Sequence, residues 1–367
     1  MGKNYTKEVN YWYDKFSLTR NVSERISVIK DICGLQKPKQ FYEELDIGNM
    51  IIDISSDFEK EGIEETYVEF LEWLKRVYPG IFEFGFPWHC RNLLYHYIAE
   101  GKRQKVADII IPFFQTPERD LDVFADILDV LRVNGFPALT GKLVRTAYPK
   151  IKAKSDILSW ALAELSQLCG VSIISEHITI GGGIQSKAIG KLKDDLSEFD
   201  CEWETEFIVE IITRLSGKRD TRNRWTASDF ICKDRFAKNL NLLFLDFVRY
   251  LNRDKNIDLI CADAFRDLVY RYLIHEINAG NKPFYQLRRQ QADEYIAGLC
   301  GFISLMQTRA FALLCGLKLF YDFLQTEGMF DAKEHTRIMN DIAHLKEGLC
   351  TAFKQGLWKY QFIEKWL

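Results

Sequence analysis

The chain has 367 residues, and its 49 lysines and arginines nearly balance its 52 aspartates and glutamates, which leaves a net charge of −3. Apolar residues make up 47% of the sequence and aromatic residues 14%, so the chain can build large packed cores and is not intrinsically disordered. The near-neutral charge gives no support to a bulk attraction to nucleic acid. At about 100–200 residues per domain, the length indicates two domains or one elongated repeat array.

The N-terminal residues and the cysteines favour a cytoplasmic protein. The first residues, MGKNYTKEVNYWYDKF, lack the apolar stretch and the small-residue cleavage site of a secretory signal. The nine cysteines include no C-x-x-C pair, which is typical of free thiols in a reducing compartment. The longest apolar stretch without a charge, residues 295–308, is shorter than the roughly 20 residues that span a membrane. We therefore expect a cytoplasmic protein with no membrane span, in which residues 295–308 belong to a core helix.

A repeating pattern of helices follows residues 1–46, which we assign to N-terminal helices. Apolar residues recur at helical spacing over 47–58 and over 64–78, and Gly62 separates the two segments. Further helices are separated by Gly101 and Gly135, with ends at Pro117 and Pro149 and a kink at Pro112, and a helix over 157–168 closes at Gly170. These four glycines are 39, 34 and 35 residues apart. A fixed period in this range predicts stacked helical hairpins over residues 47–170.

In period and layout, residues 47–170 resemble the tetratricopeptide class of α-solenoid. Leu94, Leu128 and Leu162 are spaced by 34 residues, although Tyr95, Asp129 and Ala163 stand where that family has glycine after the leucine. Degenerate hairpins of the HEAT kind fit almost as well. The resemblance implies an all-α, right-handed superhelix of antiparallel helical hairpins, with a concave surface that binds partners.

Residues 171–227 predict a loop-rich junction with one or two helices. Three consecutive glycines, 181–183, lie within HITIGGGIQSKAIGK (residues 177–191), which indicates a flexible loop, because glycine is costly inside a helix. For residues 173–180 a helix that ends before Thr179 is favoured over a short strand. A helix over 204–215 and an irregular stretch over 216–229 follow.

Residues 228–367 predict longer helices. Ser228 with Asp229 can cap a helix that runs to Leu251, and Asn256 can cap the next, which runs to Asn278. One long or kinked helix is expected over 286–324, and a last one from 330 toward Trp358. Two arrangements remain open, a separate bundle and a continuation of the solenoid.

No motif for metal or cofactor chemistry emerges from the sequence. His89 and Cys90 are adjacent rather than spaced as zinc ligands, and Asp341-x-x-His344 is only half of a di-iron motif. Gly183 and Gly190 are too far apart for a phosphate-binding loop. We therefore predict no metal and no cofactor, and the sequence identifies no catalytic residue.

Acidic residues form the first candidate binding surface. Residues 42–76 contain 11 acidic and 3 basic residues, and three aspartates at i, i+4 and i+7 follow in a later helix of the array. Either these side chains form a solvated face, or they line a groove for a basic peptide. The candidate residues are Asp53, Asp57, Asp122, Asp126 and Asp129.

A basic loop beside a tryptophan is the second candidate. Five cations could bind phosphate groups while the indole stacks on a base, which would make an anion or nucleic-acid site. The loop could equally be a solvated surface, or it could dock onto the acidic helical array of the same chain. Its residues are Arg214, Lys218, Arg219, Arg222, Arg224 and Trp225.

Three functions follow from these patterns. The first is a non-enzymatic scaffold or adaptor that binds a protein or peptide along the helical array. The second is a helical-repeat protein that associates with nucleic acid through the basic loop. The third is an α-helical enzyme with a site between the array and the long C-terminal helices, which would require a pocket with converging polar groups. Partner identity and oligomeric state are left open.

Overall fold

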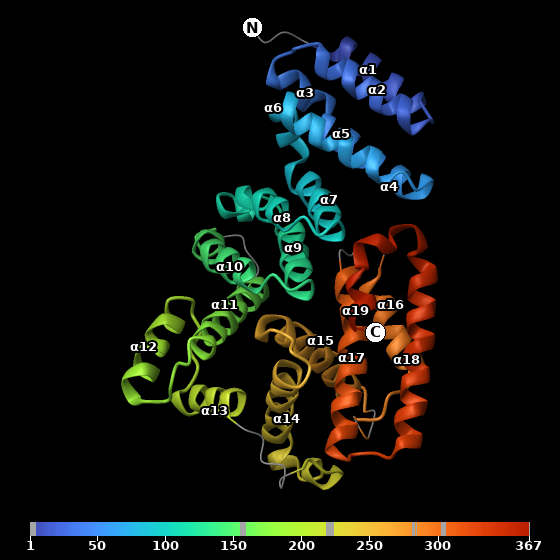
Figure 1. Cartoon of the computed structure of the whole chain (residues 1–367). Coiled ribbons are helices and arrows are strands. Elements are labelled where there is room, and N and C mark those ends of the chain that lie inside the picture. Colours follow the sequence, from blue (N-terminus) through green and yellow to red (C-terminus); the bar gives the residue numbers. More distant parts are fainter. Residues whose placement is uncertain are drawn as a thin grey trace. The chain divides into compact units, whose positions relative to one another are not determined.

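The computed structural model describes residues 5–154, 159–217, 224–280, 283, 285–301 and 306–366 (Figure 1). Over these residues every regular element is helical, with nineteen α-helices and five short 3₁₀ helices, which confirms the all-α prediction. In the same part of the chain, no helix combines the length and the apolar character that crossing a membrane requires.

The chain divides into two compact units. Unit 1 comprises Met1–Ile111 together with Lys354–Lys359, and unit 2 comprises Pro112–Phe353 together with Tyr360–Leu367. The chain passes from unit 1 to unit 2 between Ile111 and Pro112, which lies inside residues 47–170, the segment predicted to be one repeat array. It returns to unit 1 only for the six residues Lys354–Lys359 near the C-terminal end.

Unit 1 is built from short amphipathic helices around an aliphatic and aromatic core. Ile47, Ile51 and Ile54 are fully buried along α4, and Leu71 and Leu74 of α5 are buried as well, as the apolar spacing predicts. The helices are α1 (Thr6–Leu18), α2 (Val22–Gly34), α3 (Lys39–Leu45), α4 (Ile47–Glu61), α5 (Glu64–Val77), α6 (Pro79–Phe82), η1 (Glu83–Gly85), α7 (Phe86–Ala99) and α8 (Arg103–Ile109). The 3₁₀ helix η2 (Ile111–Phe114) lies at the crossing into unit 2, and η5 (Lys354–Tyr360) contains the returning segment.

In unit 2 each α-helix from α9 to α17 packs against the next one along the chain. The elements are η3 (Pro117–Arg119), α9 (Leu121–Val133), α10 (Pro137–Lys152), α11 (Ser159–Thr179), α12 (Ser186–Ser197), α13 (Thr205–Ser216), η4 (Ala227–Phe230), α14 (Lys233–Arg253), α15 (Leu259–Asn278), α16 (Arg289–Leu299), α17 (Gln307–Glu327), α18 (Ala332–Ala352) and α19 (Phe362–Trp366). The two longest neighbours at the C-terminal end, α17 and α18, lie side by side (Figure 1).

Helix α15 is the centre of unit 2, because it packs against α9, α11, α14 and α17. It starts at Asp258, whose side chain accepts a hydrogen bond from the backbone N–H of Cys261 at 2.9 Å. Gly316 permits the close approach of α17, since a Cβ there would lie 2.9 Å from the side chain of Val269 and 3.2 Å from the carbonyl oxygen of Phe265. The arrangement brings segments more than 100 residues apart in sequence to the same place.

Three of the four glycines that the sequence predicts to end helices lie in turns, and the fourth does not. Gly62, Gly101 and Gly135 have positive φ angles of 68°, 65° and 75° and follow the ends of α4, α7 and α9, as predicted. Gly170 instead lies inside α11, where a Cβ would meet Trp203 at 2.9 Å and the Cys201 sulfur at 3.0 Å. The prediction that a helix closes at Gly170 is therefore wrong, because this glycine provides space for packing rather than a turn.

Several predicted boundaries also differ. Helix α10 continues through Pro149 to Lys152, whereas the sequence predicts an end at that proline. The residues after Gln185 form α12, so the loop predicted over residues 177–191 is confined to its middle part. Thr226 and Asp229 cap the short helix η4, and α14 starts only at Lys233.

The predicted long helix over residues 286–324 is two helices, α16 and α17, and the apolar stretch 295–308 covers the end of one and the start of the other. The start of the preceding long helix also differs from the prediction, because Asp258 rather than Asn256 caps α15. Asn256 adopts a positive φ of 54°, which places it in the turn before the helix. Asp331 accepts a hydrogen bond from the Glu334 N–H and starts α18, as predicted.

Candidate functional site

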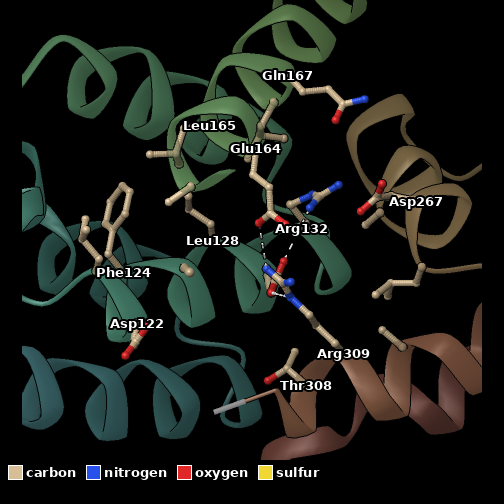
Figure 2. Close-up of a pocket in the computed structure, with 18 of the residues that line it drawn as sticks. Asp122, Phe124, Leu128, Arg132, Glu164, Leu165, Gln167, Asp267, Thr308 and Arg309 are labelled. Atoms are coloured by element: carbon tan, nitrogen blue, oxygen red, sulfur yellow. Dashed lines mark hydrogen bonds and ion pairs between the residues drawn. The ribbon is translucent and has the colours of Figure 1, made fainter. Parts of the chain in front are cut away.

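A cavity of about 460 Å³ lies in unit 2 among α9, α11, α15 and α17 (Figure 2). We call it the ionic cavity, because many of the side chains that line it are charged. Phe124, Leu128 and Leu165 gather on one side of it, and Arg132, Glu164 and Arg309 lie together on the other (Figure 2). The volume falls within the roughly 300–1,000 Å³ typical of ligand-binding pockets.

Helical spacing explains how these side chains converge. Asp129 and Arg132 are three residues apart on α9, and Asp263 and Asp267 are four apart on α15, so each pair lies on one face of its helix. Arg309 stands in the first turn of α17. The neighbouring Thr308 hydroxyl donates to the buried Asp126 carboxylate of α9 at 2.9 Å, which fixes the start of α17 against α9.

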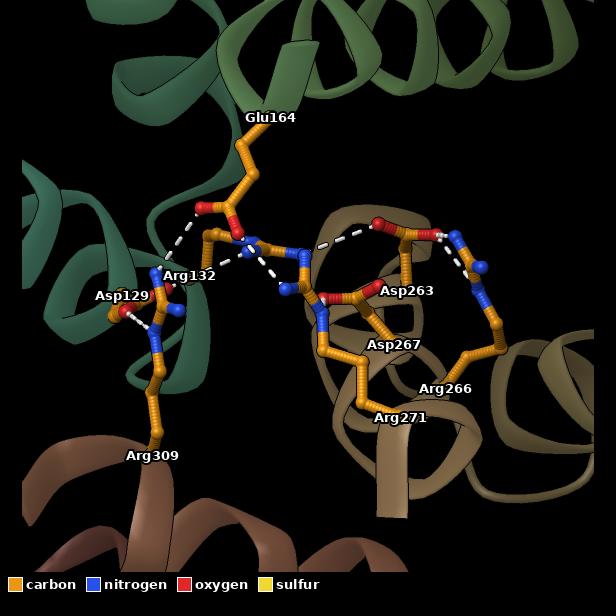
Figure 3. A network of polar contacts seen from close by, with 8 residues as sticks. All are labelled: Asp129, Arg132, Glu164, Asp263, Arg266, Asp267, Arg271 and Arg309. Atoms are coloured by element: carbon orange, nitrogen blue, oxygen red, sulfur yellow. Dashed lines mark hydrogen bonds and ion pairs between the residues drawn. The ribbon is translucent and has the colours of Figure 1, made fainter. Parts of the chain in front are cut away.

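Eight charged residues form one alternating series across the cavity (Figure 3). We call it the ionic chain; in order, it comprises Asp267, Arg271, Glu164, Arg309, Asp129, Arg132, Asp263 and Arg266. Every link joins an arginine to a carboxylate, and the residues come from α9, α11, α15 and α17. The ionic chain therefore ties together four helices that are distant in sequence.

The distances along the centre of the ionic chain range from 2.5 to 3.5 Å. Arg309 Nε donates to Asp129 Oδ2 at 2.5 Å, and Arg309 Nη2 reaches Glu164 Oε2 at 3.5 Å. Arg271 Nη1 lies 2.8 Å from the other oxygen of Glu164. Arg132 Nη2 donates to Asp263 Oδ2 at 3.1 Å, and its Nη1 lies 3.5 Å from Asp129. Such charge-assisted hydrogen bonds are about twice as strong as neutral ones.

The electrostatics of the ionic chain keep its arginines charged. The Asp129 carboxylate raises the pKa of the Arg309 guanidinium above its ordinary value, and this effect exceeds the opposite effect of burial. Burial alone would lower the pKa of Arg266 and Arg271, but the neighbouring carboxylates outweigh it and raise both pKa values. The cavity thus presents fixed positive and negative charges side by side.

Other polar groups in the lining remain available to a ligand. Within the described part of the chain, the Asp122 carboxylate and the Gln167 amide form no hydrogen bond or ion pair with their side chains. The buried Nε of Arg132 and the Oε2 of Glu118 also lack hydrogen-bond partners there. Trp160 stands at the cavity with 56% of its surface exposed. These groups could recognise a molecule that brings both donors and acceptors.

Each carboxylate of the ionic chain lies within ion-pair distance of an arginine. Within the described part of the chain, no group of three or more histidine, cysteine or acidic residues could hold a metal ion.

The predicted acidic surface on α9 faces inward for the most part. Asp126 is 3% exposed and accepts from Thr308, and Asp129 pairs with Arg309, so neither belongs to an exposed acidic face. Their interpretation as parts of such a surface is therefore wrong, because the polar face of α9 packs against α15 and α17. Asp122, at the N-terminal end of α9, is exposed.

The other two predicted acidic residues lie in unit 1, on α4. Asp57 pairs with Arg25 of α2 at 2.7 Å, and Asp53 is exposed. The structure therefore assigns the five aspartates to two different units.

The structure describes three residues of the predicted basic loop. Arg214 pairs with Glu210 and Asp246, and the Trp225 indole N–H donates to the same Asp246 at 2.9 Å. Arg224 is exposed. Lys218, Arg219 and Arg222 lie outside the described residues. The partners Glu210 and Asp246 belong to α13 and α14, so the described contacts do not join the loop to the predicted array over residues 47–170.

Sequence reasoning missed most of the ionic chain, including Arg132, Glu164, Arg266, Arg271 and Arg309. One signal was present, because Arg309 is followed at once by the apolar run 310–317, and an arginine in such a context requires a carboxylate partner. That partner, Asp129, lies 180 residues earlier.

Comparison with known protein families, with curated proteins and with solved structures finds no match for the chain. The assignment of a function therefore depends on the geometry of the ionic cavity.

Proposed function

We propose that the protein is a non-enzymatic scaffold or adaptor, and that its ionic cavity binds a short peptide segment of a partner protein. The ionic cavity carries this proposal, because it combines an apolar wall with paired charges of both signs. A peptide brings backbone donors and acceptors together with apolar side chains, so it suits such a lining. The packing of successive helices in unit 2 and the glycine turns after α4, α7 and α9 support a solenoid built from helical hairpins.

The charges of the lining favour a peptide with at least one basic residue. Seven carboxylates and five arginines line the cavity, so acidic groups are in excess. The ionic chain contains equal numbers of both signs, and the excess lies in and around η3 and the start of α9, where Asp122 has no partner among the described residues. A lysine or arginine of the bound peptide would pair with Asp122.

Photo-cross-linking on the full chain tests this function. A benzophenone amino acid replaces Trp160 at the cavity or, as a control, Ile231, which is 77% exposed and outside the lining. The probes are biotinylated pools of eight-residue peptides with basic, neutral or acidic mean composition. We expect several-fold more cross-linked peptide at position 160 than at position 231, and the largest yield with the basic pool.

Asp122→Asn serves as the matched variant. It removes one exposed charge without a partner among the described residues, and it should reduce the yield of the basic pool toward that of the neutral pool. Equal labelling at positions 160 and 231, or labelling at neither, would contradict the proposal.

A further inference from the structure

A second cavity, of about 260 Å³, adjoins the ionic cavity in unit 2. It lies among α11, α13, α14 and α15, and most of its lining is apolar; we call it the apolar cavity. Phe207, Ile211, Phe244, Leu245 and Val248 form much of its wall. Burial of a large apolar side chain there would favour binding, because it removes apolar surface from water.

Three polar residues line both cavities, namely Gln167, Asp263 and Arg266. They mark the place where the ionic chain ends and the apolar wall begins. A ligand that entered both cavities would therefore pass these side chains.

Arg266 contributes a guanidinium group to this junction. It is the last member of the ionic chain, and it shares the single carboxylate of Asp263 with Arg132. Both its Nε and its Nη2 donate to Asp263 Oδ1, whereas its Nη1 has no hydrogen-bond partner among the described residues. The Nη1 can donate to a further carboxylate, for which a planar guanidinium is well suited.

We infer that the apolar cavity and Arg266 together bind the C-terminal residue of a peptide, with its apolar side chain in the cavity and its α-carboxylate on Arg266. This inference rests on the proposed function, because the preceding residues of the same peptide would occupy the ionic cavity. The Gln167 amide, which forms no hydrogen bond among the described residues, stands where the peptide backbone would pass.

The geometry favours a chain terminus over an acidic side chain. A C-terminal residue carries a carboxylate and a bulky apolar group on the same Cα, as the adjoining anion site and apolar wall require. An aspartate or glutamate would place its carboxylate on Arg266 and leave the apolar cavity empty. Capture of a C-terminal carboxylate is an established mode of peptide recognition.

Fluorescence anisotropy with the full chain tests the inference. The probes are N-terminally labelled pools of eight-residue peptides, randomised at the first seven positions and ending in phenylalanine, either as the free acid or as the carboxamide. A third pool ends in serine as the free acid. We expect the phenylalanine acid to bind at least about tenfold more tightly than its amide, because the amide loses a charge-assisted pair with Arg266. The serine pool should also bind more weakly.

Three variants locate the effect. Arg266→Gln should bring the affinities of acid and amide together, whereas Lys233→Gln removes an exposed charge outside both cavities and should leave their ratio unchanged. Leu245→Trp should fill the apolar cavity and weaken the phenylalanine acid while leaving the ionic chain intact.

Equal binding of acid and amide by the unmodified protein would overturn the inference and leave the proposed function standing. An unchanged ratio in a folded Arg266→Gln protein would also overturn it. Absence of binding by every pool, together with absence of cross-linking at position 160, would overturn both. Tighter binding of decanoate than of the phenylalanine acid would reject a peptide terminus in favour of a free amphipathic carboxylate.

Discussion

At the scale of single residues, Arg309 is a central member of the ionic chain. It joins the carboxylates of Asp129 and Glu164, which belong to two other helices, and its own side chain is only 19% exposed. An arginine in this position offsets two partly buried negative charges. Its removal takes away one of the two arginine partners of each carboxylate, which costs more than loss of an exposed ion pair.

We expect Arg309→Met to lower the free energy of unfolding by about 2–4 kcal/mol, measured by urea denaturation. Arg337→Met is the matched control, because Arg337 also pairs with two carboxylates, Glu334 and Asp341, but is 47% exposed. Its loss should cost about 0–1 kcal/mol. Equal effects of the two substitutions would contradict the central role of Arg309.

Lys359 in unit 1 leads to a prediction about pH. Its ammonium lies 5.6 Å from the ring centre of Trp358 and 5.9 Å from that of Tyr95, and burial lowers its pKa to about 8. Below that pH the lysine is charged in both folded and unfolded states, so the full cost of burying the charge opposes folding. As the pH rises from about 8 to the unfolded value of 10.5, the folded protein loses the proton first and this cost disappears.

We therefore expect Lys359→Met to be more stable than the unmodified chain at pH 7, and this advantage to shrink steadily between about pH 8 and pH 10.5. The difference between the two proteins is the measured quantity, because tyrosines and cysteines titrate in the same range and cancel in it. Denaturation at a series of pH values gives this difference. A constant difference across the range would show that the pKa of Lys359 is not lowered.

At the scale of elements, two helical glycines predict opposite effects of the same substitution. A Cβ at Gly316 would lie 2.9 Å from Val269, where α17 crosses α15, whereas a Cβ at Gly190 of α12 would meet nothing within 4 Å. We expect Gly316→Ala to destabilise the protein by about 1–3 kcal/mol and Gly190→Ala to stabilise it by about 0.5–1 kcal/mol.

Thermal unfolding of the two variants checks both signs, and far-ultraviolet circular dichroism shows whether each keeps its helices. Stabilisation by Gly316→Ala would mean that α15 and α17 lie farther apart than the structure places them. Destabilisation by Gly190→Ala would mean that α12 does not extend through this residue.

Local sequence signals predict the positions of the helices well, but they do not predict which helices pack against each other. Apolar spacing and terminal glycines place α4, α5 and α9 within a few residues, because these signals are local. Gly170 shows the limit, since its role depends on Trp203, which is more than 30 residues away.

The candidate site follows the same rule. The spacing of Asp126 and Asp129 correctly predicts one polar helix face, but whether that face meets water or an arginine depends on Arg309 in a helix far along the chain. Local sequence patterns could therefore not predict the ionic chain. The exception is Arg309, because its position beside an apolar run indicates that it needs a carboxylate partner.

At the scale of the whole molecule, unit 1 contains a short segment that lies far from the rest of it in sequence. Within that segment Trp358 packs edge-on against Tyr95 and against His96 of α7, with ring centres 6.5 Å apart in both cases. The segment therefore supplies part of the aromatic packing of α7, although more than 200 residues separate them in sequence.

We expect Trp358→Ala to speed amide hydrogen exchange in α7 by at least about tenfold while leaving α15 unchanged. Trp366→Ala is the control, because Trp366 packs on Phe265 in unit 2 and should speed exchange in α15 but not in α7. Exchange measured by mass spectrometry distinguishes the two patterns. Equal changes in both helices for each variant would contradict the division into two units.

The return of Lys354–Lys359 to unit 1 also sets the order of events during translation. Residues 1–111 leave the ribosome first, but the tryptophan that packs on α7 is synthesised only after residue 353. At about 5–20 residues per second, the first unit waits roughly 10–50 seconds for its last segment. Throughout that interval Tyr95 lacks the ring that packs against it in the folded protein, so unit 1 completes its core only when nearly the whole chain has been made.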